Sequence, residues 1–170
     1  MQLISNDGFV EDPWRRLDDN SVDGAGVPND GDVIIDHHRL TALTSGGGRN
    51  GRTGLHIEND ATVASLHNVL PRLDLISIEF PANGDGRGFS LARQLRTMGF
   101  TGELRASGPL IVDQFAYALA CGFDTVEIPD DLAKRQPEVQ WLKARDAIKP
   151  GFQLGYPATV DVLARRHPEL

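Results

Sequence analysis

The chain has 170 residues, of which 40% are hydrophobic and 24% are charged, and its formal net charge at pH 7 is −7. This length and composition predict a soluble globular protein with a substantial core, and the acidic balance argues against a nucleic-acid or membrane partner. The single cysteine, Cys121, excludes a disulfide framework or a cysteine-ligated metal cluster within one chain. Without a signal peptide or an apolar run of about 20 residues, the sequence predicts a cytoplasmic protein.

The first part of the chain has little to bury. Residues 1–32 are expected to form an irregular, mobile N-terminal segment, because residues 18–32 are mostly Asp, Asn and Gly. The glycine-rich stretch 45–52 predicts a second flexible segment. Residues 33–170 are therefore expected to form a single α/β domain.

Within that domain, short apolar strands alternate with amphipathic helices. We expect the first helix to be capped by Asn59 or Asp60, the second by Ser90, and the third to carry Pro109 in its first turn. A last short helix is expected after Thr159. Four to five such βα units predict a mainly parallel sheet, either an open sheet or part of a βα barrel. The strands are predicted at 33–35, 55–57, 75–80, 103–106 and 125–128.

Two segments repeat the same local pattern at the end of a helix. Gly99-Phe100 and Gly122-Phe123 each precede a predicted strand. A glycine in the left-handed conformation typically ends a helix, and the apolar residue after it folds back on the last turn. The pattern therefore predicts helix ends at both glycines.

The turn Gly84-Asp85-Gly86-Arg87-Gly88-Phe89-Ser90 is the strongest candidate for a ligand site. It follows a predicted parallel strand, where α/β proteins bind their ligands, and it opens a helix whose free N–H groups attract anions. We expect Arg87 and Arg105 to converge there; the alternative is a tight turn in which Arg87 pairs with Asp85 or Glu79. The predicted ligand-binding residues are Asp85, Gly86, Arg87, Gly88, Ser90, Arg105 and Gln114.

Carboxylates near the strand ends are candidates for acid–base chemistry. Asp113 and Glu79 are the catalytic candidates, provided that burial raises a carboxyl pKa; the alternative is that they orient arginines or cap helices. The histidines show no metal-ligand spacing, and no flavin, nicotinamide, haem or cluster motif is visible. The sequence predicts no metal and no evident cofactor, and it leaves open whether the protein is an enzyme. Cys121 is expected to be a packed, unreactive core residue.

The segment 80–123 resembles a bacterial family of unknown function, DUF934, and weaker similarity extends from about 33 to 156. The resemblance implies a role in sulfate assimilation, because genes of this family lie beside sulfite reductase and their products are often labelled as oxidoreductases involved in sulfite reduction. The residues that carry the resemblance are Asp85-Gly86-Arg87-Gly88-Phe89-Ser90, Ala92-Arg93, Leu95-Arg96, Gly102-Glu103-Leu104-Arg105-Ala106, Gly108, Asp113-Gln114 and Cys121-Gly122-Phe123-Asp124.

Residues and resemblance together favour a cytoplasmic accessory protein of assimilatory sulfite reduction. It is expected to bind an oxyanion or phosphate-bearing ligand, such as sulfite or an adenylyl sulfate, at the strand ends. Two alternatives stay open: a small-molecule enzyme with a carboxylate base at the same site, and a ligand-free scaffold that docks on sulfite reductase. A homodimer that covers the sheet edges is a further expectation.

Overall fold

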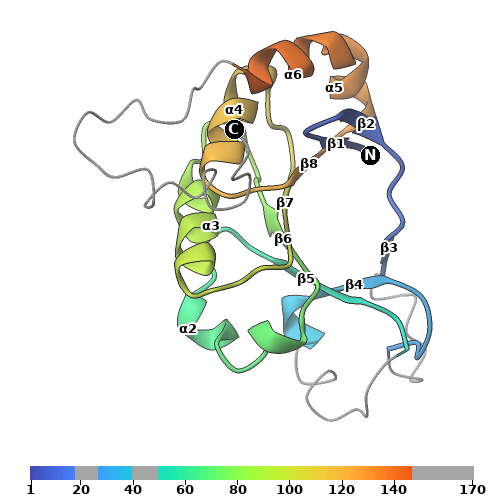
Figure 1. Cartoon of the computed structure of the whole chain (residues 1–170), viewed down its shortest axis with the longest axis vertical. Coiled ribbons are helices and arrows are strands. Elements are labelled where there is room, and N and C mark those ends of the chain that lie inside the picture. Colours follow the sequence, from blue (N-terminus) through green and yellow to red (C-terminus); the bar gives the residue numbers. More distant parts are fainter. Residues whose placement is uncertain (18–26, 40–49, 147–170) are drawn as a thin grey trace.

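The structure is a computed structural model, and it describes residues 1–17, 27–39 and 50–146. Its centre is one eight-stranded sheet with the order β2-β1-β8-β7-β6-β5-β4-β3 (Figure 1). Strands β3 to β8 run parallel, whereas β1 is antiparallel to both of its neighbours. The strands are β1 Gln2–Ser5, β2 Gly8–Val10, β3 Arg15–Arg16, β4 Val33–Asp36, β5 Thr53–Ile57, β6 Leu75–Glu79, β7 Glu103–Ser107 and β8 Thr125–Ile128.

Helices cover one face of this sheet. Figure 1 shows α2, α3 and α4 side by side along that face, and α5 and α6 beyond β8. None of the described helices is long and apolar enough to cross a membrane. The helices are α2 Val63–Leu66, α3 Arg87–Thr97, α4 Val112–Ala120, α5 Asp130–Arg135 and α6 Glu138–Arg145, with short 3₁₀ turns η2 His37–Arg39 and η3 Leu70–Arg72.

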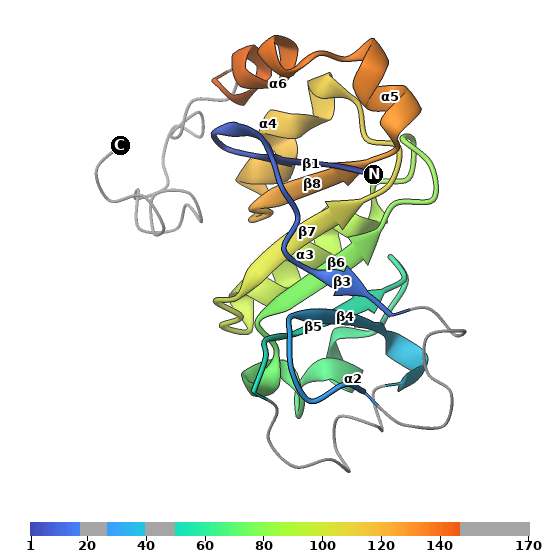
Figure 2. The ribbon, with the colours of Figure 1, turned by 90° about the vertical axis from the view of Figure 1, so that its right-hand side faces the viewer.

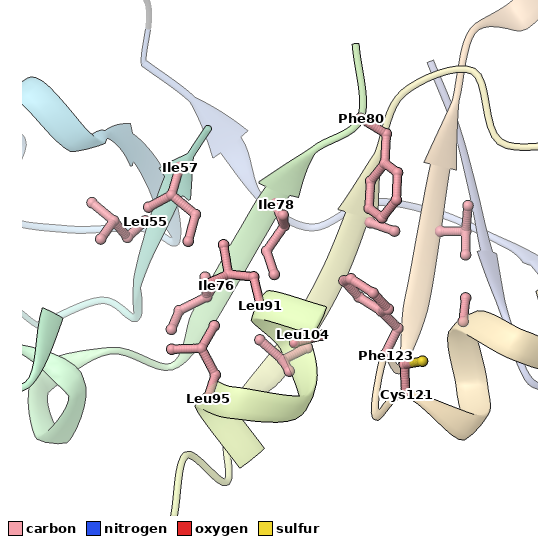
Figure 3. Close-up of a cluster of buried hydrophobic side chains, with 14 of the residues drawn as sticks. Leu55, Ile57, Ile76, Ile78, Phe80, Leu91, Leu95, Leu104, Cys121 and Phe123 are labelled. Carbon is pink, nitrogen blue, oxygen red and sulfur yellow. The ribbon is translucent and has the colours of Figure 1, made fainter. Parts of the chain in front are cut away.

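The core lies between the sheet and these helices, because side chains alternate between the two faces of a strand. In β6, Ile76 and Ile78 point toward the helices, and Leu91 and Leu95 of α3 pack against them (Figure 3). Leu104 of the neighbouring β7 belongs to the same buried cluster. The residues between these apolar positions therefore point to the opposite face of the sheet.

That opposite face is concave. Arg16 of β3 donates a hydrogen bond to Glu127 of β8, at 3.1 Å, although five strand spacings of about 4.8 Å would separate the two strands in a flat sheet. The edge strands β2 and β3 are joined by residues 11–14, which run across this face (Figure 2). Trp14 packs there against Ile34 and Leu75. Because the sheet is curled, side chains on its concave face contact one another across the sheet. They form a second buried region that is largely polar.

The structure confirms a mixed α/β fold with a mostly parallel sheet, and it corrects two details. The expected number of strands was too low, and the irregular N-terminal segment predicted for 1–32 is wrong for residues 1–17, which contribute β1, β2 and β3. Residues 18–26, the greater part of 45–52 and the helix expected after Thr159 lie outside the described residues.

Helix boundaries follow the predicted pattern with small shifts. Gly99 and Gly122 have φ values of 91° and 102°, and the amide of Phe100 donates to the carbonyl of Leu95, so both predicted helix ends are confirmed. The predicted starts are wrong. The N-caps are Thr62, Gly86 and Ile111, so Ser90 lies inside α3 and Pro109 precedes α4.

Candidate functional site

The predicted anion-binding turn is closed by its own carboxylate. Asp85 accepts hydrogen bonds from the backbone N–H of Arg87 at 3.2 Å and from its Nη2 at 2.7 Å. Asp60 adds a second carboxylate 4.0 Å from the same guanidinium. The Arg87 guanidinium holds the pKa of Asp85 well below its usual range. The structure thus shows the alternative in which Arg87 pairs with Asp85 within a tight turn. The carboxylates of Asp85 and Asp60 would repel an anionic ligand there.

The other predicted residues of this turn have structural roles. A Cβ on Gly88 would lie 2.5 Å from Cζ of Phe80, so glycine lets α3 approach β6 closely. Gln114 accepts a hydrogen bond from the Ile111 amide and donates one to the Asn83 carbonyl. It therefore ties the start of α4 to the loop after β6. Ser90 is exposed within α3.

The predicted convergence of Arg87 and Arg105 is wrong. Arg105 lies on β7 between Leu104 and Ala106, which both face the helices, so its side chain points to the concave face. There it is fully buried, and it donates to both oxygens of Asp12 and to Oε1 of Glu103. Arg87 is on the helix side and its side chain is 58% exposed. Arg105 is thus a structural cation that fixes residues 11–14 on the sheet.

A different group of side chains meets at the carboxyl ends of the parallel strands on the concave face. Nη2 of Arg16 donates to Glu127 at 3.1 Å and, more weakly, to Oγ of Ser77 at 3.4 Å. Ser77 contacts Nδ1 of His56 at 3.0 Å, and Ser107 donates to Glu127 at 2.8 Å. We call Arg16, His56, Ser77, Ser107 and Glu127 the strand-end cluster.

The hydrogen bonds of Ser77 assign the tautomer of His56. Ser77 is fully buried, so its hydroxyl proton needs an acceptor. Arg16 only donates, and Nδ1 of His56 is the one acceptor that the described residues place on this hydroxyl. The tautomer with the hydrogen on Nε2 satisfies this hydroxyl, because Nδ1 then accepts the Ser77 proton. His56 presents a neutral N–H donor at this end of the sheet.

Burial, reinforced by the positive charge of Arg16, lowers the pKa of His56 to about 4, while Asp36 and Glu127 act in the opposite direction. In the unfolded chain the imidazole titrates near pH 6.5. Between these values the unfolded state binds the extra proton, so folding stability falls as the pH drops from 6.5 to 4, by up to about 3 kcal/mol.

We expect His56→Gln to remove most of this loss, as measured by urea unfolding at pH 7.0, 5.5 and 4.5. His67→Gln, at a position where the helix α2 ends, is the matched control and should leave the pH dependence of the parent protein intact. An unchanged pH dependence in His56→Gln would show that His56 is not held neutral.

Two further carboxylates border the cluster. Glu79 follows Ser77 by two residues on the same face of β6, and Asp36 is the register partner of His56. Within the described ranges, neither side chain has a hydrogen-bond or ion-pair partner. Asp113 is exposed in the first turn of α4, which packs on the helix side. The structure therefore does not bring the two catalytic candidates, Asp113 and Glu79, together.

In the part of the chain that the structure describes, no group of three or more His, Cys, Asp or Glu side chains is arranged to hold a metal ion. Cys121 is buried at the end of α4, and burial raises the pKa of its thiol. This is the packed core cysteine that the sequence predicts.

Sequence reasoning missed most of the strand-end cluster. Ser77 and Glu79 alternate with apolar residues in β6, and this period of two predicts a second face with polar side chains. The apolar character of the strand as a whole hid that signal. Arg16 carries no comparable signal, because its two-residue strand is defined by pairing with β4.

Residues 54–155 match the model of a family described as "Bacterial protein of unknown function (DUF934)". The matched range begins in β5 and extends past α6, so it includes His56, Ser77, Glu79, Ser107 and Glu127. Arg16 lies before it. No curated protein matches the chain.

Proposed function

The chain belongs to the DUF934 family of bacterial proteins, and we propose that it is a cytoplasmic accessory protein of assimilatory sulfite reduction that binds a small oxyanion. The metabolic role rests on the family resemblance, which also makes sulfite reductase the proposed partner. The ligand site that we propose is the strand-end cluster. Its position at the carboxyl ends of parallel strands is where α/β folds bind ligands.

The observation that carries the proposal is the state of Arg16. Its side chain is 37% exposed, and only Nη2 has a partner among the described residues. Nε and Nη1 lie on opposite sides of the guanidinium, and each remains as a separate donor for one oxygen of an oxyanion. By contrast, Arg87 and Arg105 are each held by carboxylates at two or more points.

His56 supports the same ligand class. Its Nε2–H adds a donor without adding a charge, and the neutral form persists at pH 7 because the pKa is about 4. Arg16 and His56 both contact the hydroxyl of Ser77. Their remaining N–H groups can therefore bind different oxygens of one anion. Both of these donors lie on the concave face, away from the turn at 84–90.

Calorimetric titration with sulfite and with adenylyl sulfate tests this proposal. Arg16→Gln removes the cation and should weaken binding at least about tenfold, the value of one charge-assisted hydrogen bond. Arg87→Gln is the matched control, since it removes an arginine from the turn, and it should bind like the parent protein. Weakening by Arg87→Gln with no effect of Arg16→Gln would contradict the proposed site.

An enzymatic role is the second candidate, and Glu79 is the observation that favours it. A half-buried carboxylate at a strand end, with no donor among the described residues, is suitably placed to accept a proton from a bound substrate. This role predicts turnover of a small sulfated or phosphorylated substrate that Glu79→Gln abolishes. Asp113→Asn should leave such turnover unchanged, because Asp113 lies on the helix side.

A further inference from the structure

We propose that the strand-end cluster selects oxyanions that retain a proton, and that Glu79 accepts the hydrogen bond from that proton. This inference rests on the proposed function, because it concerns the ligand held by Arg16. It adds a specificity-determining residue and a chemical class of ligand to the site.

The strand-end cluster is surrounded by more negative than positive charge. Arg16 supplies one positive charge, and Glu127 already lies 3.1 Å from it. Asp36 and Glu79 add two carboxylates on the same face without a described cation, and His56 is neutral. Arg105 on the same face is already paired with Asp12 and Glu103. The carboxylates on this face therefore outnumber the guanidinium groups, and a fully deprotonated dianion would meet repulsion that a protonated ligand avoids.

Glu79 lies on the same face of β6 as Ser77, which Arg16 contacts. It lies two residues beyond Ser77 along β6, about 7 Å further on, and its register partner on β7 is Ser107. Ser107 in turn pairs with Glu127 on β8. Arg16 contacts Ser77 and Glu127, so its contacts flank Glu79 both along β6 and across the strands. An anion that is bound to Arg16 and extends past Ser77 toward the carboxyl end of β6 would reach the Glu79 carboxylate.

Hydrogen-bond chemistry then decides which anion fits. An ionised carboxylate only accepts hydrogen bonds, and so does sulfate, which has no proton at neutral pH. Phosphate and hydrogensulfite each retain an O–H group, which donates a short, charge-assisted hydrogen bond to a carboxylate. Glu79 consequently discriminates by protonation state between anions of nearly equal size.

Titration of the full chain at pH 7 with inorganic phosphate and with sulfate tests this inference. The parent protein should bind phosphate at least about tenfold more tightly than sulfate, because sulfate leaves Glu79 desolvated and unpaired. Glu79→Gln replaces one acceptor by an N–H donor, so it should erase or reverse this preference. Asp36→Asn removes the same charge from the same face but leaves the Glu79 acceptor in place, so it should lower the preference less than Glu79→Gln does.

Equal binding of the two anions by the parent protein would overturn the inference, and so would an equal loss of preference in Asp36→Asn and Glu79→Gln. Those results leave oxyanion binding itself intact, provided that Arg16→Gln still weakens binding. If neither anion nor sulfite binds to the folded parent protein, both the inference and the proposed function are overturned.

Discussion

Arg105→Met is expected to lower the free energy of unfolding by about 3 kcal/mol. The guanidinium is fully buried, and its donors bind Asp12 at 2.6 and 3.0 Å and Glu103 at 3.1 and 3.2 Å. Methionine fills a similar volume but leaves both carboxylates without their cation. The side chains of Asp12 and Glu103 are 30% and 24% exposed, so water can solvate part of their unpaired charge. We therefore expect a loss of stability at the lower end of the range for breaking a buried ion pair. Urea unfolding at pH 7 measures it.

Arg87→Met is the matched control for this change. That arginine also pairs with a nearby carboxylate, but its side chain is 58% exposed, and exposed ion pairs contribute little. We expect its free energy of unfolding to stay within about 0.5 kcal/mol of the parent value. Equal stability of the two variants, with loss of anion binding in Arg105→Met, would show that Arg105 serves a ligand and not the fold.

Gly108→Ala is expected to destabilise the protein by about 3 kcal/mol or more. Gly108 follows β7 with a φ of 148°, which disfavours any side chain, and a new Cβ would collide with the backbone carbonyl of Phe80. Its amide donates to the Glu127 carbonyl at 2.9 Å. The close approach keeps the ends of β6, β7 and β8 together, directly beside Ser107 and Glu127.

Gly84→Ala provides the comparison, because a Cβ there meets no atom within 4 Å and the backbone is not left-handed. We expect this variant to unfold within about 0.5 kcal/mol of the parent protein. Thermal and urea unfolding of both variants check the contrast. Similar stability of the two would mean that the β7 end relaxes freely around an added methyl group.

Local patterns were sufficient to predict the helix-facing half of the molecule. Residues such as Ile76, Ile78 and Leu104 pack against amphipathic helices that follow them closely in sequence. The apolar pattern of each strand and of the helix after it is therefore sufficient to predict that they pack together. Gly99 and Gly122 mark helix ends through local backbone geometry alone. Local chemistry also decides the turn at Arg87, since its partner Asp85 is two residues away.

The concave half depends on contacts between distant residues, and for this reason the sequence did not predict it. β1 pairs with β8, and Arg105 binds Asp12 across 93 positions of the chain. Such pairings have no short-range periodicity. The face of Arg105 was predictable in principle, because its neighbours Leu104 and Ala106 are apolar and strand side chains alternate. Arg16 became a candidate only once the curled sheet placed it against Ser77 and Glu127.

A crystal structure of the protein with bound sulfite or phosphate tests the central claim most directly. The account predicts the anion on the concave face, with its oxygens within hydrogen-bond distance of Nε or Nη1 of Arg16 and of Nε2 of His56. An anion bound instead at the turn 84–90, with Arg87 released from Asp85, would contradict it.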